Sequence, residues 1–547
     1  MTDTTEDRSM SIEVPVPVAV REAAEGAEAT EATEPVGLAD RQPLSLTEEE
    51  MSRAGRRAID VIVERLQAGA NGPVLVRGRR EDLERVWREP LPEQGDDLVA
   101  LLDRLARDRT GLGVGMHSDH PRCFSFVPCA GNFPAVLADA LVAAFLSVPG
   151  AWLVGAGPTQ IELTTLAWLR ELLGLGPDTS GLFVSGGSVA TLTALTAARD
   201  HRLDGVLAGA RAYSTTQAHP SVARALHILG LNRDQLIALE PDAGLRMDPA
   251  VLADRVRRDR AAGLRPFLVV ATAGTTSTGA IDPLADLAAL CEQEGLWLHV
   301  DGAFGAAAAI TARGRAVLAG LDLADSITLD PHKWLFQPYE IGCVLLRRPE
   351  LLKESFGLAR HFLDTGYLAV TESGGEPVSS SNPGPTPGLK AVPDAAEVNL
   401  SDYGPQQTRG LRALKLWLSL KTFGAAAFRE AVERGMELAD HAGALVEAQP
   451  ELELTSSPQL GIFTFRFRPS GMERGATLDA FQSAVSNAVL DAGYAMVTTT
   501  QVRGETVLRM CTINPRTDSV QVEKTLDHVV QIGRSLAVLR AGTGPTG

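Results

Sequence analysis

Lys333 is the residue of this sequence whose surroundings most strongly suggest chemistry. It lies in the run SITLDPHKWLFQPYEIGCVLLRR, between two apolar stretches that are typical of a strand hairpin. Low-dielectric surroundings favour the neutral form of an amine, and a neutral, partly desolvated amine is the form that makes an imine with an aldehyde. Taken alone, a lysine between strands is more often salt-bridged or extended towards solvent. The other motifs decide between the two interpretations.

The run LFVSGGSVATLTAL predicts an anion site. An apolar strand leads into Ser185, Gly186, Gly187 and Ser188, and a helical pattern follows. Glycines let an anion approach the backbone closely, and a helix N-terminus offers N–H groups and the positive end of the dipole. An ordinary strand–helix turn is the alternative. No Gly-Lys-Ser/Thr follows, which argues against a nucleotide P-loop.

Three further side chains follow strand-like runs. Asp301 ends the apolar run LWLHVDGAFG, where a carboxylate is costly without a cationic partner such as a protonated pyridine nitrogen. A helix cap or a salt bridge is the other interpretation. His219 precedes a helical pattern in AYSTTQAHPSVARA, and Thr276 lies on a strand-end loop in VATAGTTSTGAIDP. Each of these two is compatible with an ordinary cap or loop residue.

The elements that position these residues are an alternation of strands and helices. Apolar runs of four to eight residues alternate with helical stretches from Phe133 onward, which predicts a mostly parallel, doubly wound sheet with ligands at the carboxyl ends of its strands. We predict four regions: a disordered acidic tail (1–46), a helical N-terminal domain (47–132), a large domain (133–418, with a flexible Gly/Pro/Ser-rich loop at 370–399) and a small α/β domain (419–540).

Composition narrows the class of protein. The chain has 547 residues, 45% hydrophobic and 22% charged, which is ordinary for a large globular protein, and its net charge of −17 argues against a nucleic-acid partner. The beginning is acidic without an apolar core, and the uncharged run 140–161 is broken by Pro and Gly, so neither a secretory signal nor a membrane span is predicted. The five cysteines have no CxxC or His-rich spacing, which indicates a reducing cytoplasm and no zinc site.

The motifs together resemble one family. The run around Pro331, His332, Lys333 and Trp334 is similar to the Schiff-base lysine motif of the pyridoxal-phosphate (PLP) group II amino-acid decarboxylases, which include the aromatic-L-amino-acid decarboxylases. Five motifs occur in the family's order, and the resemblance covers about residues 47–535. It implies PLP fold-type I (aspartate aminotransferase-like) with a mostly parallel central sheet, a homodimer, and decarboxylation of an L-amino acid to its amine and carbon dioxide.

The resemblance also implies roles for individual residues. Lys333, Asp301, His219 and Tyr367 match the catalytic positions: the cofactor-bearing lysine, the partner of the ring nitrogen, the imidazole stacked on the ring, and the loop tyrosine that protonates the substrate carbon. The remaining cofactor-binding positions are Gly187, Ser188, Thr276, Ala303 and His332. This chain departs from relatives in having Val189 where an acidic residue is common and a longer insertion after Tyr367. Asp330 stands where some relatives carry asparagine.

The substrate is expected to bind in an apolar pocket. Segments that resemble the family's pocket contribute Phe124, Phe126, Cys129, Trp152 and Thr408. Such a pocket favours an aromatic or bulky aliphatic side chain over a carboxylate. We therefore predict an aromatic L-amino acid, with branched aliphatic amino acids as the alternative. An oxidative relative that releases aldehyde, an aminotransferase and a non-catalytic binding protein remain rival interpretations of the same fold.

Overall fold

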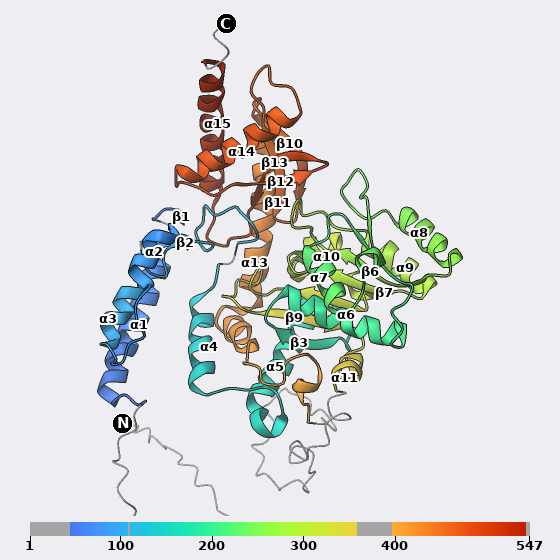
Figure 1. The fold of residues 1–547 in the computed structure, drawn as a ribbon, viewed down its shortest axis with the longest axis horizontal. Helices are drawn as coiled ribbons and strands as arrows, with labels where there is room; N and C mark the ends of the chain where they lie inside the picture. The colour runs from blue at the N-terminus through green and yellow to red at the C-terminus, as the bar shows by residue number, and fades with distance from the viewer. Residues whose placement is uncertain (1–43, 70, 108–109, 129, 358–396, 543–547) are drawn as a thin grey trace, which may run out of the picture. The chain divides into compact units, whose positions relative to one another are not determined.

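The computed structural model describes residues 44–542 except 70, 108–109, 129 and 358–396 (Figure 1). The chain divides into two units, residues 1–59 and 60–547. The described part of the first unit contains the beginning of α1 (Glu48–Ala68). A capping box starts this helix: the Thr47 N–H donates to the Glu50 carboxylate (2.8 Å) and the Glu50 N–H donates to the Thr47 hydroxyl (3.3 Å). The predicted helical start at Thr47 is confirmed, whereas most of the predicted tail lies outside the described residues.

The second unit opens with short elements. Two helices, α2 (Arg80–Trp87) and α3 (Leu98–Leu105), confirm the helical pattern. The side chain of Asp97 caps α3 by accepting from the Ala100 N–H (2.9 Å). The two-residue strands β1 (Leu75–Val76) and β2 (Gly115–Met116) pair antiparallel. The sequence did not predict this pairing, because two residues are too few to display a strand's alternation.

The uncharged run 140–161 forms the end of one helix, a turn and the beginning of the next. These helices are α4 (Phe133–Ala144) and α5 (Trp152–Leu173), and α5 leaves helical geometry at Gly155. Pro149 and Gly150, two of the residues that break this run in the sequence, lie between the two helices. Among the described residues, no helix is both long and apolar enough to span a membrane.

A seven-stranded sheet forms the centre of the second unit. Its strand order is β3-β9-β8-β7-β6-β4-β5, and every strand is parallel to the others except β9, which is antiparallel to both neighbours. The strands are β3 (Ser180–Val184), β4 (Ala210–Thr215), β5 (Leu236–Leu239), β6 (Arg265–Thr272), β7 (Trp297–Asp301), β8 (Ser326–Leu329) and β9 (Gly342–Leu346). The predicted mostly parallel sheet and the predicted hairpin around Lys333 are confirmed.

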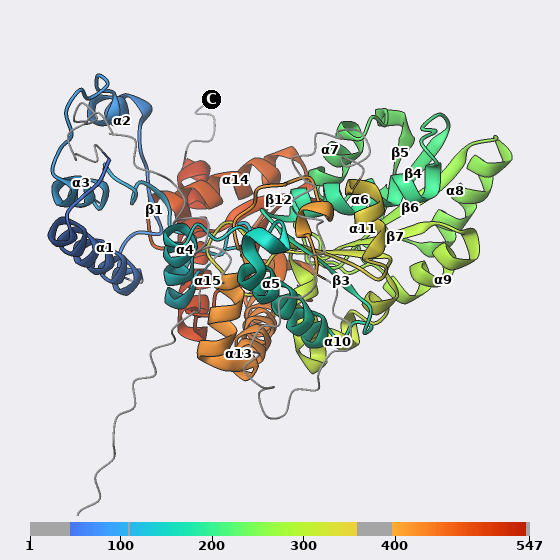
Figure 2. The same ribbon diagram turned by 90° about the horizontal axis from the view of Figure 1, so that it is seen from below.

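Helices cover both faces of this sheet because its strands are apolar on both sides. On β6, Leu268 and Val270 join one buried cluster and Val269 and Ala271 join the other. Figure 2 shows α6 and α10 on opposite sides of the strands. Helices of the first cluster are α6 (Gly187–Leu203), α7 (Pro220–Ile228) and α11 (Glu350–Phe356). The second cluster includes residues of α8 (Pro249–Ala261) and α9 (Leu284–Glu294) and Leu318, the C-cap of α10 (Ala312–Val317).

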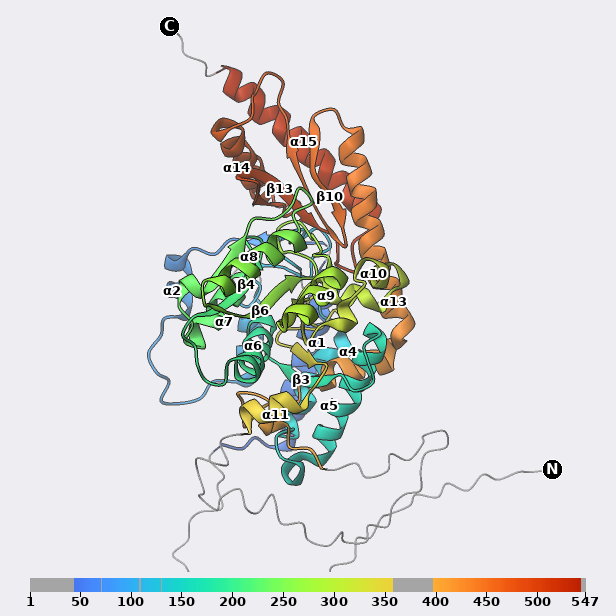
Figure 3. The ribbon, with the colours of Figure 1, turned by 90° about the vertical axis from the view of Figure 1, so that its right-hand side faces the viewer.

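A four-stranded antiparallel sheet carries the C-terminal region (Figure 3). Its strands are β10 (Leu452–Gln459), β11 (Ile462–Phe467), β12 (Thr498–Val502) and β13 (Glu505–Cys511), in the order β10-β11-β13-β12. Phe463, Phe465 and Phe467 alternate along β11 and are buried against α14 (Ala476–Asp491) and α15 (Ser519–Gly542). Complete burial of such a side chain contributes about 1.5–3 kcal/mol.

One long helix connects the two sheets. Helix α13 (Ala413–Ala448) is interrupted at Gly424, whose φ of 77° lies in the left-handed region that glycine tolerates. The helix contributes to both cores: its buried apolar residues from Ala413 to Met436 pack in the core of the large sheet, and those from Leu438 to Val446 pack in that of the small sheet. The domain boundary that we predict at residues 418–419 therefore falls inside a helix shared by both cores.

Candidate active site

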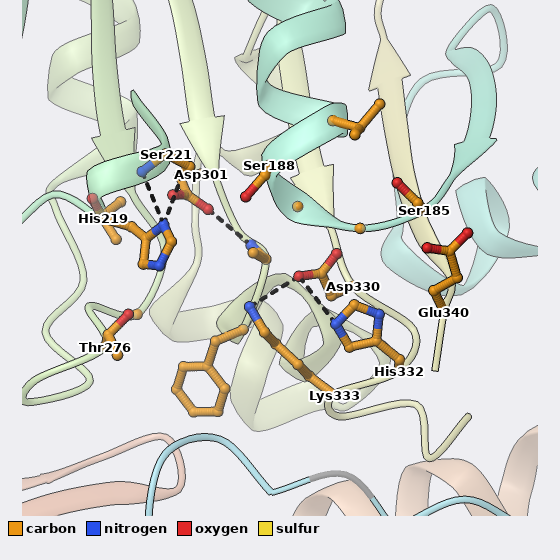
Figure 4. A pocket seen from close by; sticks show the side chains of 17 residues that line it. Ser185, Ser188, His219, Ser221, Thr276, Asp301, Asp330, His332, Lys333 and Glu340 are labelled. Carbon is orange, nitrogen blue, oxygen red and sulfur yellow. Dashed lines mark hydrogen bonds and ion pairs between the residues drawn. The ribbon is translucent and has the colours of Figure 1, made fainter. Parts of the chain in front are cut away.

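The loops that follow the strands of the large sheet enclose a cavity of about 290 Å³ (Figure 4). This is the edge at which a doubly wound sheet places its ligands. Most of the predicted cofactor-binding and catalytic residues that the structure describes line it: Gly187, Ser188, His219, Thr276, Asp301, Ala303, His332 and Lys333. Segments up to 146 residues apart along the sequence, from 187 to 333, thus meet at one site.

Lys333 lies in the turn that connects β8 to β9. Its backbone N–H donates to the carbonyl of Asp330 (2.9 Å), which closes the turn. The same two residues form an ion pair, with 2.9 Å between Lys333 Nζ and Asp330 Oδ2. The lysine side chain is 26% exposed and the carboxylate only 3%, so the pair is open to the cavity at the lysine end. Lys333 is both salt-bridged and accessible to a ligand.

His332 shares the carboxylate of Asp330. Its Nε2 lies 3.6 Å from Asp330 Oδ2, and its Nδ1 accepts from the Ile341 N–H (3.4 Å). Burial lowers the pKa of His332 and outweighs the opposite effect of Asp330, so the ring is neutral at pH 7. The second carboxylate oxygen, Asp330 Oδ1, is buried and has no hydrogen-bond partner among the described residues.

Asp301 and His219 approach the cavity from two parallel strands. Asp301 ends β7, is 7% exposed, and accepts from the Ala303 N–H (3.2 Å). His219 caps α7: its Nδ1 accepts from the Ser221 N–H (3.2 Å) and lies 2.8 Å from the Ser221 hydroxyl. Because Nδ1 accepts, the proton of the neutral ring lies on Nε2. Desolvation lowers the pKa of His219, while Asp301 acts in the opposite direction.

The N-terminus of α6 forms a cradle for an anion. Gly186 caps this 17-residue helix and has no side chain that could accept from the first N–H groups, so these receive no side-chain acceptor from the cap. A Cβ atom added to Gly187 would lie 2.8 Å from Asp330 Oδ2, and one added to Gly186 would lie 3.3 Å from His332 Cε1. Only glycines leave this space open, and Ser188 adds a hydroxyl beside it.

Thr276 is held by a strand of the other sheet. The guanidinium of Arg509 on β13 is 3% exposed, donates from Nε to the Thr276 carbonyl (2.8 Å), and donates from Nη1 to the Phe126 carbonyl. Burial lowers the pKa of this guanidinium. Asn514, in the same C-terminal run, donates to the carbonyls of Asp119 and His120 (3.1 and 3.0 Å). Arg509 thus holds the loop that presents Thr276, and Asn514 holds the segment around residues 119–120.

The four predicted substrate-pocket residues that the structure describes do not line this cavity. Phe124 is fully buried in the core of the small sheet, and Phe126 is 58% exposed. The backbone N–H of Trp152 donates to Asn399 (2.9 Å) at the start of α5, and Thr408 is exposed. Cys129 and Tyr367 lie outside the described residues. A substrate-binding role for the five pocket residues and the catalytic role of Tyr367 stay predictions.

Sequence reasoning missed several residues that line the cavity: Thr272, Gly274, Phe304, Ser221 and Glu340. Ser221 could have been found, since a serine two residues after a capping histidine is placed to reach its ring. Phe304 had no signal in sequence, because its position depends on stacking against Trp334, with ring centroids 5.1 Å apart.

Comparison with known proteins identifies the family. Residues 81–374 match the sequence pattern described as the pyridoxal-dependent decarboxylase conserved domain, which is more than half of the chain. The chain belongs to this family. It is also 38% identical over 495 residues to an aromatic-L-amino-acid decarboxylase of Bacillus atrophaeus, which covers 90% of this chain and 98% of that protein. The resemblance predicted from the sequence is confirmed.

Two further comparisons extend this result. An L-2,4-diaminobutyrate decarboxylase of Rhizobium meliloti is 31% identical over 490 residues, covering 88% of this chain and 91% of that protein. The crystal structure of Oryza sativa TDC with PLP and tryptamine superposes with a TM-score of 0.81 at 24% identity, covering 91% of this chain and all of that one. The fold is therefore fold-type I, as predicted, and the chain is a PLP-dependent amino-acid decarboxylase.

The cavity fits this cofactor. PLP carries an aldehyde, a phosphate and a ring nitrogen that is protonated when paired with a carboxylate. The cavity offers an amine on Lys333, a glycine cradle at a helix N-terminus and a buried carboxylate on Asp301. Lys333 has the only lysine amine among the described residues that line it. The chemical groups of the site thus correspond one to one with those of the cofactor.

Proposed function

We propose that this protein decarboxylates an aromatic L-amino acid to the corresponding amine and carbon dioxide. The observation that carries the proposal is the convergence of Lys333, Asp301 and His219 with the glycine cradle on one cavity. The aromatic substrate is supported by the 38% identical relative of Bacillus atrophaeus. One carboxylate that lines the cavity, Glu340, contacts Arg412 (2.9 Å), which weakens its attraction for a cationic substrate.

Bound PLP would supply the electron sink for breaking the bond between Cα and the carboxylate. Lys333 would hold the cofactor through Nζ and accept the exchange with the substrate amine. Asp301 would keep the ring nitrogen protonated, and the N–H groups of α6 with Ser188 and His332 would bind the phosphate. His219, with its proton on Nε2, would lie over the ring. Ala303 and Thr276 would contact the cofactor from the loops that follow β7 and β6.

Tyr367 is proposed as the acid that returns a proton to the substrate carbon after carbon dioxide leaves. A positioned phenol acts in this way only if water is kept from the reacting carbon. We also propose a homodimer, following the family resemblance, and a cytoplasmic location. Support for the latter comes from Cys123, Cys291, Cys343 and Cys511, which are buried and unpaired in the part of the chain that the structure describes.

A substrate panel tests the proposal. The purified chain with PLP is incubated separately with each of the twenty protein amino acids and with L-2,4-diaminobutyrate, and carbon dioxide and amine are measured. Fastest turnover of Phe, Tyr, Trp or a hydroxylated analogue is expected, with valine and leucine next. Preferential turnover of diaminobutyrate or of an acidic amino acid would refute the aromatic assignment. Lys333→Ala serves as the control and should abolish both turnover and visible cofactor absorbance.

The same panel separates the rival chemistries. An oxidative relative would release aldehyde, ammonia and hydrogen peroxide, whereas an aminotransferase would release a keto acid without carbon dioxide. A non-catalytic binding protein would give none of these products. Because all of these proteins can share the fold, only the products distinguish them.

A further inference from the structure

Asp330 is a charged group of the cavity that contacts Lys333 and that the proposed function does not use. Its Oδ2 lies 2.9 Å from Lys333 Nζ and 3.6 Å from His332 Nε2, and its Oδ1 has no partner among the described residues. The side chain is 3% exposed. A carboxylate in this position therefore has the lysine ammonium as its closest positive partner.

The carboxylate of Asp330 lies beside a helix N-terminus. Its Oδ2 faces the N-terminal turn of α6, where a Cβ on Gly187 would come within 2.8 Å of it. The positive end of a 17-residue helix stabilises a negative charge there. His332 does not neutralise that charge, because burial lowers the pKa of its ring and keeps it uncharged. The carboxylate thus acts mainly on Lys333.

Joining the cofactor requires the opposite form of Lys333. The ammonium must release a proton to water, after which the electron pair of Nζ forms a bond with the aldehyde carbon, and the aldehyde oxygen leaves as water with the two protons that remained on the amine. A carboxylate at 2.9 Å stabilises the ammonium, which has no free electron pair. Each molecule of cofactor must therefore displace a stable ion pair.

We propose that Asp330 is a positioning residue that locks Lys333 as an ammonium in the cofactor-free chain and so slows the capture of PLP. The inference rests on the proposed role of Lys333 as the cofactor-bearing lysine. It is specific to this chain's aspartate, since an asparagine of the same shape has no negative charge to lock the amine. Cofactor loading would then be a slow step that sets how much of the protein is active when PLP is scarce.

The test compares cofactor capture by the full-length chain and by Asp330→Asn, both first freed of PLP. PLP is added, and the growth of the visible absorbance that marks its attachment to Lys333 is followed over time. We expect Asp330→Asn to capture PLP about three- to ten-fold faster, the range for loss of one close charge interaction of a partly exposed lysine. Asp322→Asn, an exposed carboxylate of η4 (Leu321–Leu323), removes the same charge and should leave the rate unchanged.

Two outcomes would overturn the lock. One is an Asp330→Asn rate equal to or below that of the unaltered chain, provided that thermal unfolding shows the variant to be folded. The other comes from pyridoxal, which has the aldehyde but no phosphate: a gain seen with PLP and absent with pyridoxal would place the effect of Asp330 on the phosphate instead of the lysine. Failure of the proposed role of Lys333 looks different, because then even the unaltered chain develops no absorbance, whereas failure of the proposed substrate appears in the products of the panel and leaves the absorbance intact.

Discussion

Glu162 and Arg409 form a bidentate ion pair in which neither side chain has exposed surface. Arg409 Nη2 lies 2.7 Å from Glu162 Oε1, and Nη1 lies 2.9 Å from Oε2. Both side chains also bind the backbone of Phe183 on β3: Glu162 accepts from its N–H (3.1 Å) and Arg409 donates to its carbonyl. The pair thus connects α5 and the segment before α13 to the strand that leads into the glycine cradle.

Breaking this pair on one side should be costly. We expect Arg409→Met or Glu162→Gln to lower the free energy of unfolding by about 3–5 kcal/mol, since each leaves a buried partner without compensation. The double variant should lose less than the sum of the two losses. Denaturant unfolding of the four proteins measures the coupling. The matched control is Arg77→Met, which removes an exposed pair with Asp491 (61% and 65% exposed) and should cost less than about 1 kcal/mol. Additive losses would contradict a coupled pair.

His299 should make stability depend on pH. It is fully buried on β7, with Nδ1 2.9 Å from the Ser326 hydroxyl and Nε2 3.3 Å from that of Thr328, and burial lowers its pKa to about 4. The unfolded chain therefore binds a proton between about pH 6.5 and pH 4 that the folded chain does not. Stability that is present above pH 6.5 is lost as the pH falls, by up to about 3 kcal/mol at roughly 1.4 kcal/mol per pKa unit.

The measurement is the free energy of unfolding at several pH values between 7 and 4. His299→Gln should be less stable at pH 7 but should show a flatter decline, because one proton fewer is taken up on unfolding. His120, whose pKa burial also lowers to about 4, keeps its own contribution in both proteins. His227→Gln, at an exposed position, is the control. Parallel curves for His299→Gln and the unaltered chain would show that His299 does not supply this proton.

The cofactor side of the site was predictable from the sequence because it is built from local motifs. Lys333, Asp301 and Ser188 each follow an apolar strand within a few residues, and parallel strands bring their carboxyl ends to one edge. Predicting parallel strands and reading the order of the motifs was therefore enough to predict that these three side chains share one cavity. His219 was predictable for the same reason, as the cap of the helix after β4.

The substrate side was not predictable in this way. Phe124 and Thr408 are far apart in the chain, and their surroundings depend on packing between elements that no local pattern specifies. Phe124 packs in the core of the small sheet. The position of Thr408 is set by its neighbour Arg409, which is buried in the ion pair with Glu162. Similarly, the contact of Arg509 with the Thr276 carbonyl joins residues of two different sheets. Such contacts require the tertiary structure.

Asp301→Asn should separate cofactor binding from catalysis. The amide keeps the shape of the side chain and can still accept from the Ala303 N–H, but it carries no charge to hold the ring nitrogen protonated. We expect kcat to fall by about 100-fold or more, as for removal of other groups that stabilise developing charge, while visible absorbance of the cofactor remains. Steady-state kinetics and absorbance spectra are the measurements. Asp301→Glu should recover part of the activity; an unchanged kcat in Asp301→Asn would exclude the proposed role.

Tyr367→Phe should divert the product. The phenol is proposed to deliver the proton to the substrate carbon, and the family resemblance associates phenylalanine at this position with release of aldehyde and ammonia. We expect the ratio of aldehyde to amine to rise, with carbon dioxide still released. Chromatography of both products from the preferred substrate measures the ratio. Tyr403→Phe, a tyrosine of the segment before α13, is the comparison. An amine yield unchanged by Tyr367→Phe would show that another group donates the proton.

Gly187→Ala should close the anion cradle. The new methyl group would lie 2.8 Å from Asp330 Oδ2 and 3.2 Å from the Ala303 methyl group, and both neighbours are themselves held in the site, by Lys333 and by the turn after β7. We expect the affinity for PLP to fall at least about ten-fold, equivalent to about 1.4 kcal/mol, with a smaller loss for pyridoxal, which has no phosphate to place in the cradle. Gly55→Ala, on an exposed helical position with no atom within 4 Å of the new methyl group, is the matched control. Equal losses for the two aldehydes would show that the phosphate does not bind at this helix.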